Sequence, residues 1–118
     1  MAQSYRELIV WQKAMDLVIL VYEITDNFPE EEKFGLISQM RRCAVSIPSN
    51  IAEGRRRGTR KDYRSFINIA YGSGAELETQ LEIAKRLKYL SASELKETLD
   101  LLKEVMKMLN KFLSTLRS

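Results

Sequence analysis

The chain has 118 residues, 45% of them hydrophobic and 30% charged, which predicts one globular domain spanning residues 1–118. The net charge of +3 is a weak indication of anionic partners. The absence of histidine excludes imidazole bases and Ser-His or Cys-His nucleophiles, and a single cysteine, Cys43, excludes an internal disulfide and makes a zinc site improbable. We therefore expect no enzyme, no metal and no cofactor.

The sequence also bears on location. No apolar run reaches the roughly 18 residues that a membrane span needs, and residues 1–7 lack the basic and apolar regions of a secretory signal. A lone cysteine agrees with a reducing compartment. These features predict a cytoplasmic protein with no membrane association.

Helical periodicity runs through four segments and strand alternation through none. The first helix is predicted over about residues 7–26, before Pro29. Its apolar residues recur at steps of three and four, on one face. These predicted core residues are Val10, Ala14, Leu17, Val21, Ile24 and Phe28, and a second stripe beside them comprises Trp11, Met15, Val18 and Tyr22.

The second helix is predicted over about residues 34–57, preceded by an acidic stretch, residues 30–32, that favours the start of a helix. Pro48 lies inside it and removes one backbone hydrogen bond, so we predict a kink there. Ser46, Ser49 and Asn50 are placed to offer replacement hydrogen bonds. The predicted core residues are Ile37, Met40, Ala44, Ile47 and Ile51.

The third helix is predicted over about residues 60–89, opened by Thr59 with Asp62, and the fourth from Ser91 with Glu94; both pairs resemble a capping box. Small residues at 72–75 predict that another helix approaches closely. The seam of the third helix comprises Tyr63, Phe66, Ala70, Gly74, Leu77, Leu81 and Ala84. In the fourth helix, Leu95, Leu99, Leu102, Met106, Leu109, Leu113 and Leu116 form the seam, and Leu101, Val105, Met108 and Phe112 form a second stripe.

The predicted fold is all-α, an antiparallel up-down-up-down four-helix bundle. An extended coiled coil is the alternative, but short capped connections favour the bundle. The second stripes of helices one and four exceed what an isolated bundle buries, which predicts an oligomer interface; the alternative is a generous core. The interface residues would be Trp11, Met15, Val18, Tyr22, Leu101, Val105, Met108 and Phe112.

The most distinctive polar feature is a basic cluster between helices two and three. It holds six cationic side chains within ten residues: Arg55, Arg56, Arg57, Arg60, Lys61 and Arg64. Such a cluster beside a helix amino terminus favours phosphate, and Arg41 and Arg42 would extend it along helix two. The alternative is a solvated turn whose arginines favourably end helix two.

Other polar residues have ordinary interpretations. Tyr63 and Phe66 beside the cluster would stack on bases, but their spacing favours core packing. The carboxylates Glu53, Glu76, Glu78 and Glu82 are the candidates for acid-base or metal chemistry, and helical ion pairs of Glu53 with Arg57 and Glu82 with Arg86 are the simpler expectation. Cys43 lies on or beside the apolar face of helix two and is expected to be a small hydrophobe with no chemical role.

The segment Gln39–Gly54, which reads QMRRCAVSIPSNIAEG, resembles the hallmark of the four-helix bundle proteins encoded by intervening sequences in bacterial 23S ribosomal RNA genes, also labelled S23 ribosomal proteins. Residues 8–13, the pair Tyr63 and Phe66, and residues 73–78 extend the resemblance over nearly the whole chain. Cys43 departs from it, since family members more often have alanine there.

The resemblance implies four antiparallel helices, commonly assembled as a ring of five subunits with a basic surface. A related branch includes the accessory protein of diversity-generating retroelements, which binds nucleic acid and a reverse transcriptase. The implied nucleic-acid contacts are Arg41, Arg42, Arg55, Arg56, Arg57, Arg60, Lys61 and Arg64, and no catalytic residue is implied.

Three hypotheses follow. The first is a non-catalytic homo-oligomer, a pentamer by resemblance, that binds RNA or DNA through phosphates. The second is a structural or adaptor protein that recruits a protein partner through its apolar stripes. The third, an enzyme that uses buried carboxylates, has no motif in its support.

Overall fold

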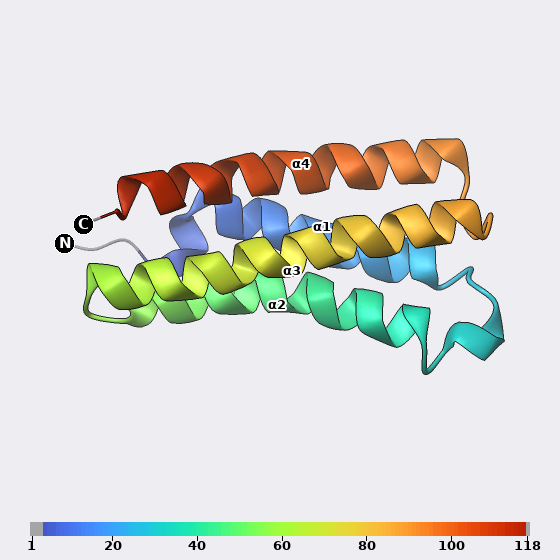
Figure 1. Ribbon diagram of the computed structural model, residues 1–118, viewed down its shortest axis with the longest axis horizontal. Coiled ribbons are helices and arrows are strands. Elements are labelled where there is room, and N and C mark those ends of the chain that lie inside the picture. Colours follow the sequence, from blue (N-terminus) through green and yellow to red (C-terminus); the bar gives the residue numbers. More distant parts are fainter. Residues whose placement is uncertain (1–3, 118) are drawn as a thin grey trace.

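The computed structural model describes residues 4–117 and confirms the all-α four-helix architecture, with no strand in that range. The helices are α1 (Ile9–Thr25), α2 (Leu36–Arg56), α3 (Arg60–Arg86) and α4 (Ala92–Thr115). Short 3-10 turns precede two of them, η1 (Tyr5–Glu7) before α1 and η2 (Glu30–Glu32) before α2. Each helix packs against its neighbours in sequence and α4 closes on α1, so α1 and α3 lie diagonally (Figure 1).

The antiparallel path decides which segments share an end of the bundle. The start of α1, the α2–α3 junction and the end of α4 lie together at one end, at the left of Figure 1. The α1–α2 and α3–α4 connections lie at the opposite end, and the molecule is 46 Å long. Basic side chains at the junction are therefore separated from residues early in α2 by most of this length.

The core is largely the one that the periodicity predicts. All six predicted core residues of the first helix are buried, as are Met40, Ala44, Ile47 and Ile51 of α2. Ile67 of α3 is fully buried but lies outside the predicted seam, whose members Tyr63 and Phe66 are only half-buried. The helix therefore turns slightly more of its Ile67 side inward than a strict heptad implies.

Capping interactions set the helix boundaries. The predicted Ser91–Glu94 capping box is confirmed, and Thr59 accepts from the Asp62 amide at 3.1 Å, which is half of the second predicted box. A third box, Ser4 with Glu7, opens η1 and carries the same sequence signature, although it was not predicted.

Helix three ends at Arg86, three residues earlier than predicted. Lys88 adopts a left-handed φ of 62°, and the Tyr89 amide donates to the Ala84 carbonyl at 3.0 Å while the Lys88 amide donates to Lys85. This is a Schellman motif with lysine where glycine is usual, so the sequence lacks the glycine that announces such an end.

Replacing Ser91 with alanine is expected to lower the free energy of unfolding by about 1 kcal/mol, because the amide of Glu94 loses its side-chain acceptor at 3.1 Å. Urea denaturation followed by circular dichroism measures the loss. Ser65→Ala on the exposed face of α3 is the control and should change stability by less than about 0.5 kcal/mol.

Pro48 lies within α2, which continues as helix on both sides of it, so the bend there stays a prediction. Asn50 donates to the Ser46 carbonyl at 2.8 Å and to the Ser46 hydroxyl at 3.0 Å. The Ser46 hydroxyl also lies 2.8 Å from that of Ser73 in α3. Polar side chains beside the proline thus join α2 to α3.

Close helix approach occurs at two glycines. A Cβ on Gly74, within the predicted small-residue segment, would meet the Met106 side chain of α4, whereas one on Gly72 would meet nothing. A Cβ on Gly54 of α2 would lie 2.9 Å from the Phe66 Cβ and 3.2 Å from the Tyr63 carbonyl oxygen. The α2–α3 pair therefore depends on Gly54 near the junction.

Candidate nucleic-acid interface

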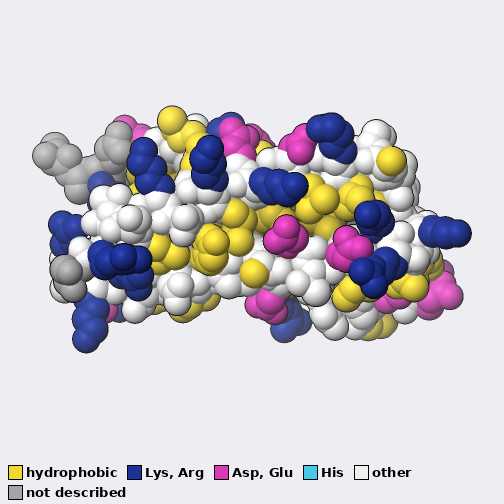
Figure 2. Space-filling view, turned by 45° about the horizontal axis from the view of Figure 1, so that its top comes forward, with side chains coloured by type: hydrophobic (Ala, Val, Ile, Leu, Met, Phe, Trp, Pro, Cys, Tyr) yellow, Lys and Arg dark blue, Asp and Glu magenta, His cyan; other side chains and the backbone are white. Residues whose placement is uncertain are grey.

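Six basic residues gather where α2 meets α3, and we call this surface the basic end: Arg55, Arg56, Arg57, Arg60, Lys61 and Arg64. The junction itself spans only residues 57–59 and contributes Arg57, and the other cations come from the last turn of α2 and the first turns of α3. On the face in Figure 2, lysine and arginine side chains dominate this end at the left, whereas both signs are mixed toward the other end.

Two of these arginines are paired with one carboxylate. Arg57 Nε donates to Glu53 at 2.9 Å and Arg56 donates to the same oxygen at 3.0 Å. The hydrogen bond from Arg57 is the largest cause that holds the pKa of the Glu53 carboxyl below its usual range, and the bond from Arg56 acts in the same direction. One carboxylate against two guanidinium groups leaves this side of the basic end cationic.

Two other arginines cap the end of α4. Arg60 donates to the Thr115 carbonyl at 2.8 Å and Arg64 donates to the Leu113 carbonyl at 3.3 Å. Carbonyls in the last turn of a helix have no partner within the helix and carry partial negative charge, so this contact is favourable. Each guanidinium has five N–H donors, which leaves donors free for a further anion.

Aromatic rings lie beside Arg55 and Arg57. The Arg57 guanidinium lies 4.9 Å from the centroid of Phe66 and that of Arg55 lies 6.0 Å from Tyr63. Tyr63 in turn packs against Phe112 with centroids 5.9 Å apart. Tyr63 packs against the core, as its spacing predicts, and burial raises its pKa. Phe66, which the spacing also assigns to the core, is only half-buried and lies outside the core cluster.

Lys61 is exposed and makes no ion pair within residues 4–117. Arg6, Lys111 and Arg117 reach the same end from η1, α4 and the residues after it, although the cluster motif does not include them. The predicted topology was the signal available for them, because an up-down bundle brings its first and last helical turns to the α2–α3 junction.

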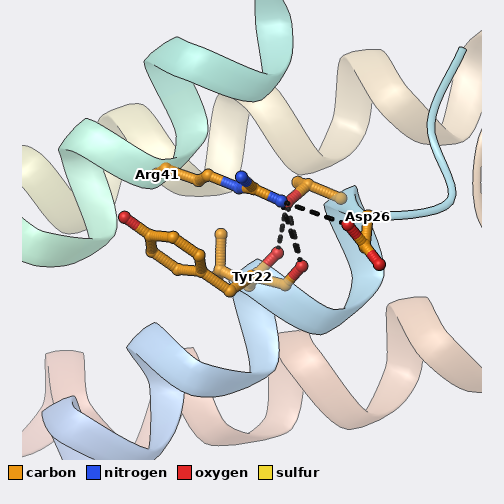
Figure 3. A network of polar contacts seen from close by, with 5 residues as sticks. Tyr22, Asp26 and Arg41 are labelled. Carbon is orange, nitrogen blue, oxygen red and sulfur yellow. Dashed lines mark hydrogen bonds and ion pairs between the residues drawn. The ribbon is translucent and has the colours of Figure 1, made fainter. Parts of the chain in front are cut away.

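Arg41 is not part of the basic end. Its side chain folds over α1, with the guanidinium 4.5 Å from the Tyr22 ring centroid, and it donates to the Thr25 hydroxyl at 3.0 Å and the Tyr22 carbonyl at 3.3 Å (Figure 3). Asp26 lies 3.9 Å away. Arg41 thus joins the end of α1 to α2, about 20 Å along α2 from Arg55. Arg42 is exposed on α2, also away from the cluster.

The predicted interface residues divide between two faces. Met15 and Tyr22 of α1 are exposed by 38% and 42%. Ile19 of α1 and Val45 of α2 are exposed as well, and we call these four apolar residues the α1–α2 strip. Met108 and Phe112 instead line a groove between α1 and α4. Val105 corrects the predicted interface: it is fully buried in the core of its own chain, because this part of the second stripe of α4 faces the other helices.

The other candidates for chemistry have structural partners. The predicted pairs Glu53–Arg57 and Glu82–Arg86 form, while Glu76 and Glu78 are exposed. Burial raises the pKa of Cys43, beside Gln80, which keeps it a thiol at neutral pH. Within residues 4–117 no three acidic or cysteine side chains come together as metal ligands, and no helix there is long and apolar enough to cross a membrane.

The fold and the basic end define a small four-helix bundle protein with a cationic pole. The chain belongs to the 23S rRNA-intervening sequence protein family, which matches residues 6–111. This confirms the family that the hallmark segment indicates.

A solved structure supports the assignment. It is the crystal structure of a protein of unknown function from the S23 ribosomal protein family of Bacteroides thetaiotaomicron, which superposes with a TM-score of 0.80 at 25% sequence identity. The match covers 89% of this chain and 98% of that one. Among curated proteins, none matches the chain.

Proposed function

We propose that this protein is a non-catalytic homo-oligomer that binds RNA or DNA through phosphates at its basic end. The observation that supports it is the gathering of cations from the end of α2, the junction and the start of α3 at one pole, with Glu53 and Asp62 as the acids of this segment. A phosphate backbone is the anionic polymer that such a pole fits, and its contacts would be salt-dependent.

Each residue would have a distinct role. Lys61 and Arg56, whose side chain is 70% exposed, reach solvent and would contact phosphates directly. Arg60 and Arg64 are held in place by α4 and would offer their free N–H groups. These donors would read phosphate oxygens rather than base edges, so little sequence discrimination is expected.

Assembly would strengthen the binding. Several copies of the basic end, held in one particle, engage one nucleic acid with higher avidity than a single copy does. The α1–α2 strip supports self-association because it leaves four large apolar side chains exposed on two adjacent helices.

Neutralising the basic end is the test. We expect Arg56→Gln with Lys61→Gln to weaken binding of fluorescent RNA or duplex DNA on the order of 30-fold at physiological salt, since two phosphate contacts are lost. Fluorescence anisotropy measures the affinity. Neither residue contacts the core, so the fold should persist by circular dichroism.

The matched control lies at the other pole. Lys85→Gln with Arg86→Gln removes the same charge, and Arg86 pairs with Glu82 at 3.0 Å much as Arg56 pairs with Glu53. This variant should bind within about twofold of wild type. Equal losses in both variants would mean that net charge, not the basic end, determines binding.

The α1–α2 strip also favours a second candidate function, an adaptor that recruits a protein partner such as a reverse transcriptase. Ile19, exposed by 57%, and Tyr22 would then be the contacts. Loss of a co-purifying partner in Ile19→Asp, with Arg56→Gln and Lys61→Gln harmless, would support the adaptor over nucleic-acid binding.

A further inference from the structure

Phe34 is the most exposed large apolar side chain in residues 4–117, at 89%. It lies in the turn between η2 and α2, at the pole opposite the basic end, and the Lys33 ammonium is 5.6 Å from its ring centroid. A phenyl ring in water gains nothing from the fold of its own chain. Its position therefore suggests a contact outside the chain.

The same chain carries an apolar groove at the other pole. It has a volume of about 410 Å³ between the start of α1 and the end of α4. Leu8, Ile9, Val10, Met108 and Phe112 line it, together with Glu7, Lys111 and Thr115. Ile9 is 60% exposed at this groove, so apolar surface is open to solvent there too.

Within one chain the ring cannot reach the groove. The 21 residues of α2 alone separate the two poles by about 30 Å. A contact between Phe34 and the groove must therefore join two molecules.

Charge favours this pairing of surfaces. Glu30 and Glu31 precede Phe34, are exposed and make no ion pair among the described residues. Lys111 in the groove is likewise exposed and unpaired within that range, and Arg60 is bonded to Thr115 of the groove lining. Lys33 beside the ring and Glu7 in the groove provide the opposite charge pair. Each surface thus carries charges that complement charges on the other, which favours their association.

We propose that Phe34 of one copy docks in the α1–α4 groove of a second copy of this chain. This inference rests on the proposed homo-oligomeric state and specifies one contact between its subunits. The two surfaces differ, so the contact is heterologous and repeats from copy to copy, as in a ring. The groove uses α1 and α4, whereas Arg56 and Lys61 lie on α2 and α3 and remain available to nucleic acid.

Light-scattering mass measurement on the full chain tests the contact. Phe34→Asp and Ile9→Asp, both at exposed positions, should each weaken assembly at least about 30-fold and give monomers with wild-type circular dichroism. Mixing the two variants should restore a dimer, because the first keeps an intact groove and the second keeps an intact Phe34. An isologous contact through either surface gives no such complementation.

Disulfide trapping is the second readout. In a Cys43→Ala background, Glu31→Cys and Lys111→Cys chains, which both keep Phe34 and Ile9, should cross-link when mixed and oxidised, and neither should cross-link efficiently alone. An oligomer that both Asp variants leave intact would overturn this contact while the proposed assembly stands. A wild type that is monomeric at all concentrations would overturn both.

Discussion

Replacing Gly54 with alanine is expected to lower the free energy of unfolding by about 2 kcal/mol. The new Cβ would lie 2.9 Å from the Phe66 Cβ and 3.2 Å from the Tyr63 carbonyl oxygen, neither of which can move without displacing α3. Overpacking of this kind costs about 1–3 kcal/mol, and the better helix propensity of alanine offsets only part of it. Urea denaturation measures the effect as a midpoint lower by about 1 M.

Gly72→Ala is the matched control for the same chemical change. Its Cβ would meet nothing, so the variant should be more stable than wild type by about 0.5–1 kcal/mol through helix propensity alone. If Gly54→Ala were as stable as Gly72→Ala, the close α2–α3 approach at the junction would be wrong.

The second large effect is expected at Arg41. Replacing it with methionine keeps an unbranched apolar stem but removes the donors to Thr25 and the Tyr22 carbonyl and the cation over the Tyr22 ring. Thr25 is fully buried and would lose one of its polar partners. The free energy of unfolding should fall by about 2 kcal/mol, because hydrogen bonds from charged groups contribute about 1.5–3 kcal/mol.

Arg42→Met is the neighbouring control, since Arg42 is exposed and should change stability by less than about 0.5 kcal/mol. Nucleic-acid affinity distinguishes the structural role of Arg41 from the phosphate contact that the sequence predicts for it. Arg41→Met should bind within about twofold of Arg42→Met; a loss at Arg41 as large as that of Arg56→Gln with Lys61→Gln would contradict its structural assignment.

The helices and most of the core follow from the sequence because each helix buries one apolar stripe at a period that can be counted. Val10 to Phe28 obey this rule throughout, and the Ser91–Glu94 box sets the start of α4 as the motif indicates. The end of α3 could not be predicted, because lysine rather than the usual glycine adopts the left-handed conformation at position 88. The predicted helix is therefore three residues too long.

Side-chain partners across helices are harder to predict than the helices themselves. Arg41 and Arg56 look alike in the sequence, yet Arg41 is fixed against α1, whereas Arg56 is largely exposed and pairs with Glu53 of its own helix. Helical rotation decides which side of a helix faces a neighbour. The prediction that Val105 lies in an interface fails for the same reason. The exposure of Phe34 could not be predicted either, because it lies in a turn, where helical periodicity does not apply.

The salt dependence of binding tests the central claim, that the basic end binds phosphates, most directly. The affinity of wild-type protein for RNA and for duplex DNA is measured by anisotropy at several salt concentrations between about 50 and 200 mM. The proposal predicts a steep linear fall of log K against log salt on both polymers, with a slope smaller by about 2 in the Arg56→Gln, Lys61→Gln variant. Binding that is insensitive to salt, or absent at the lowest concentration, would contradict it.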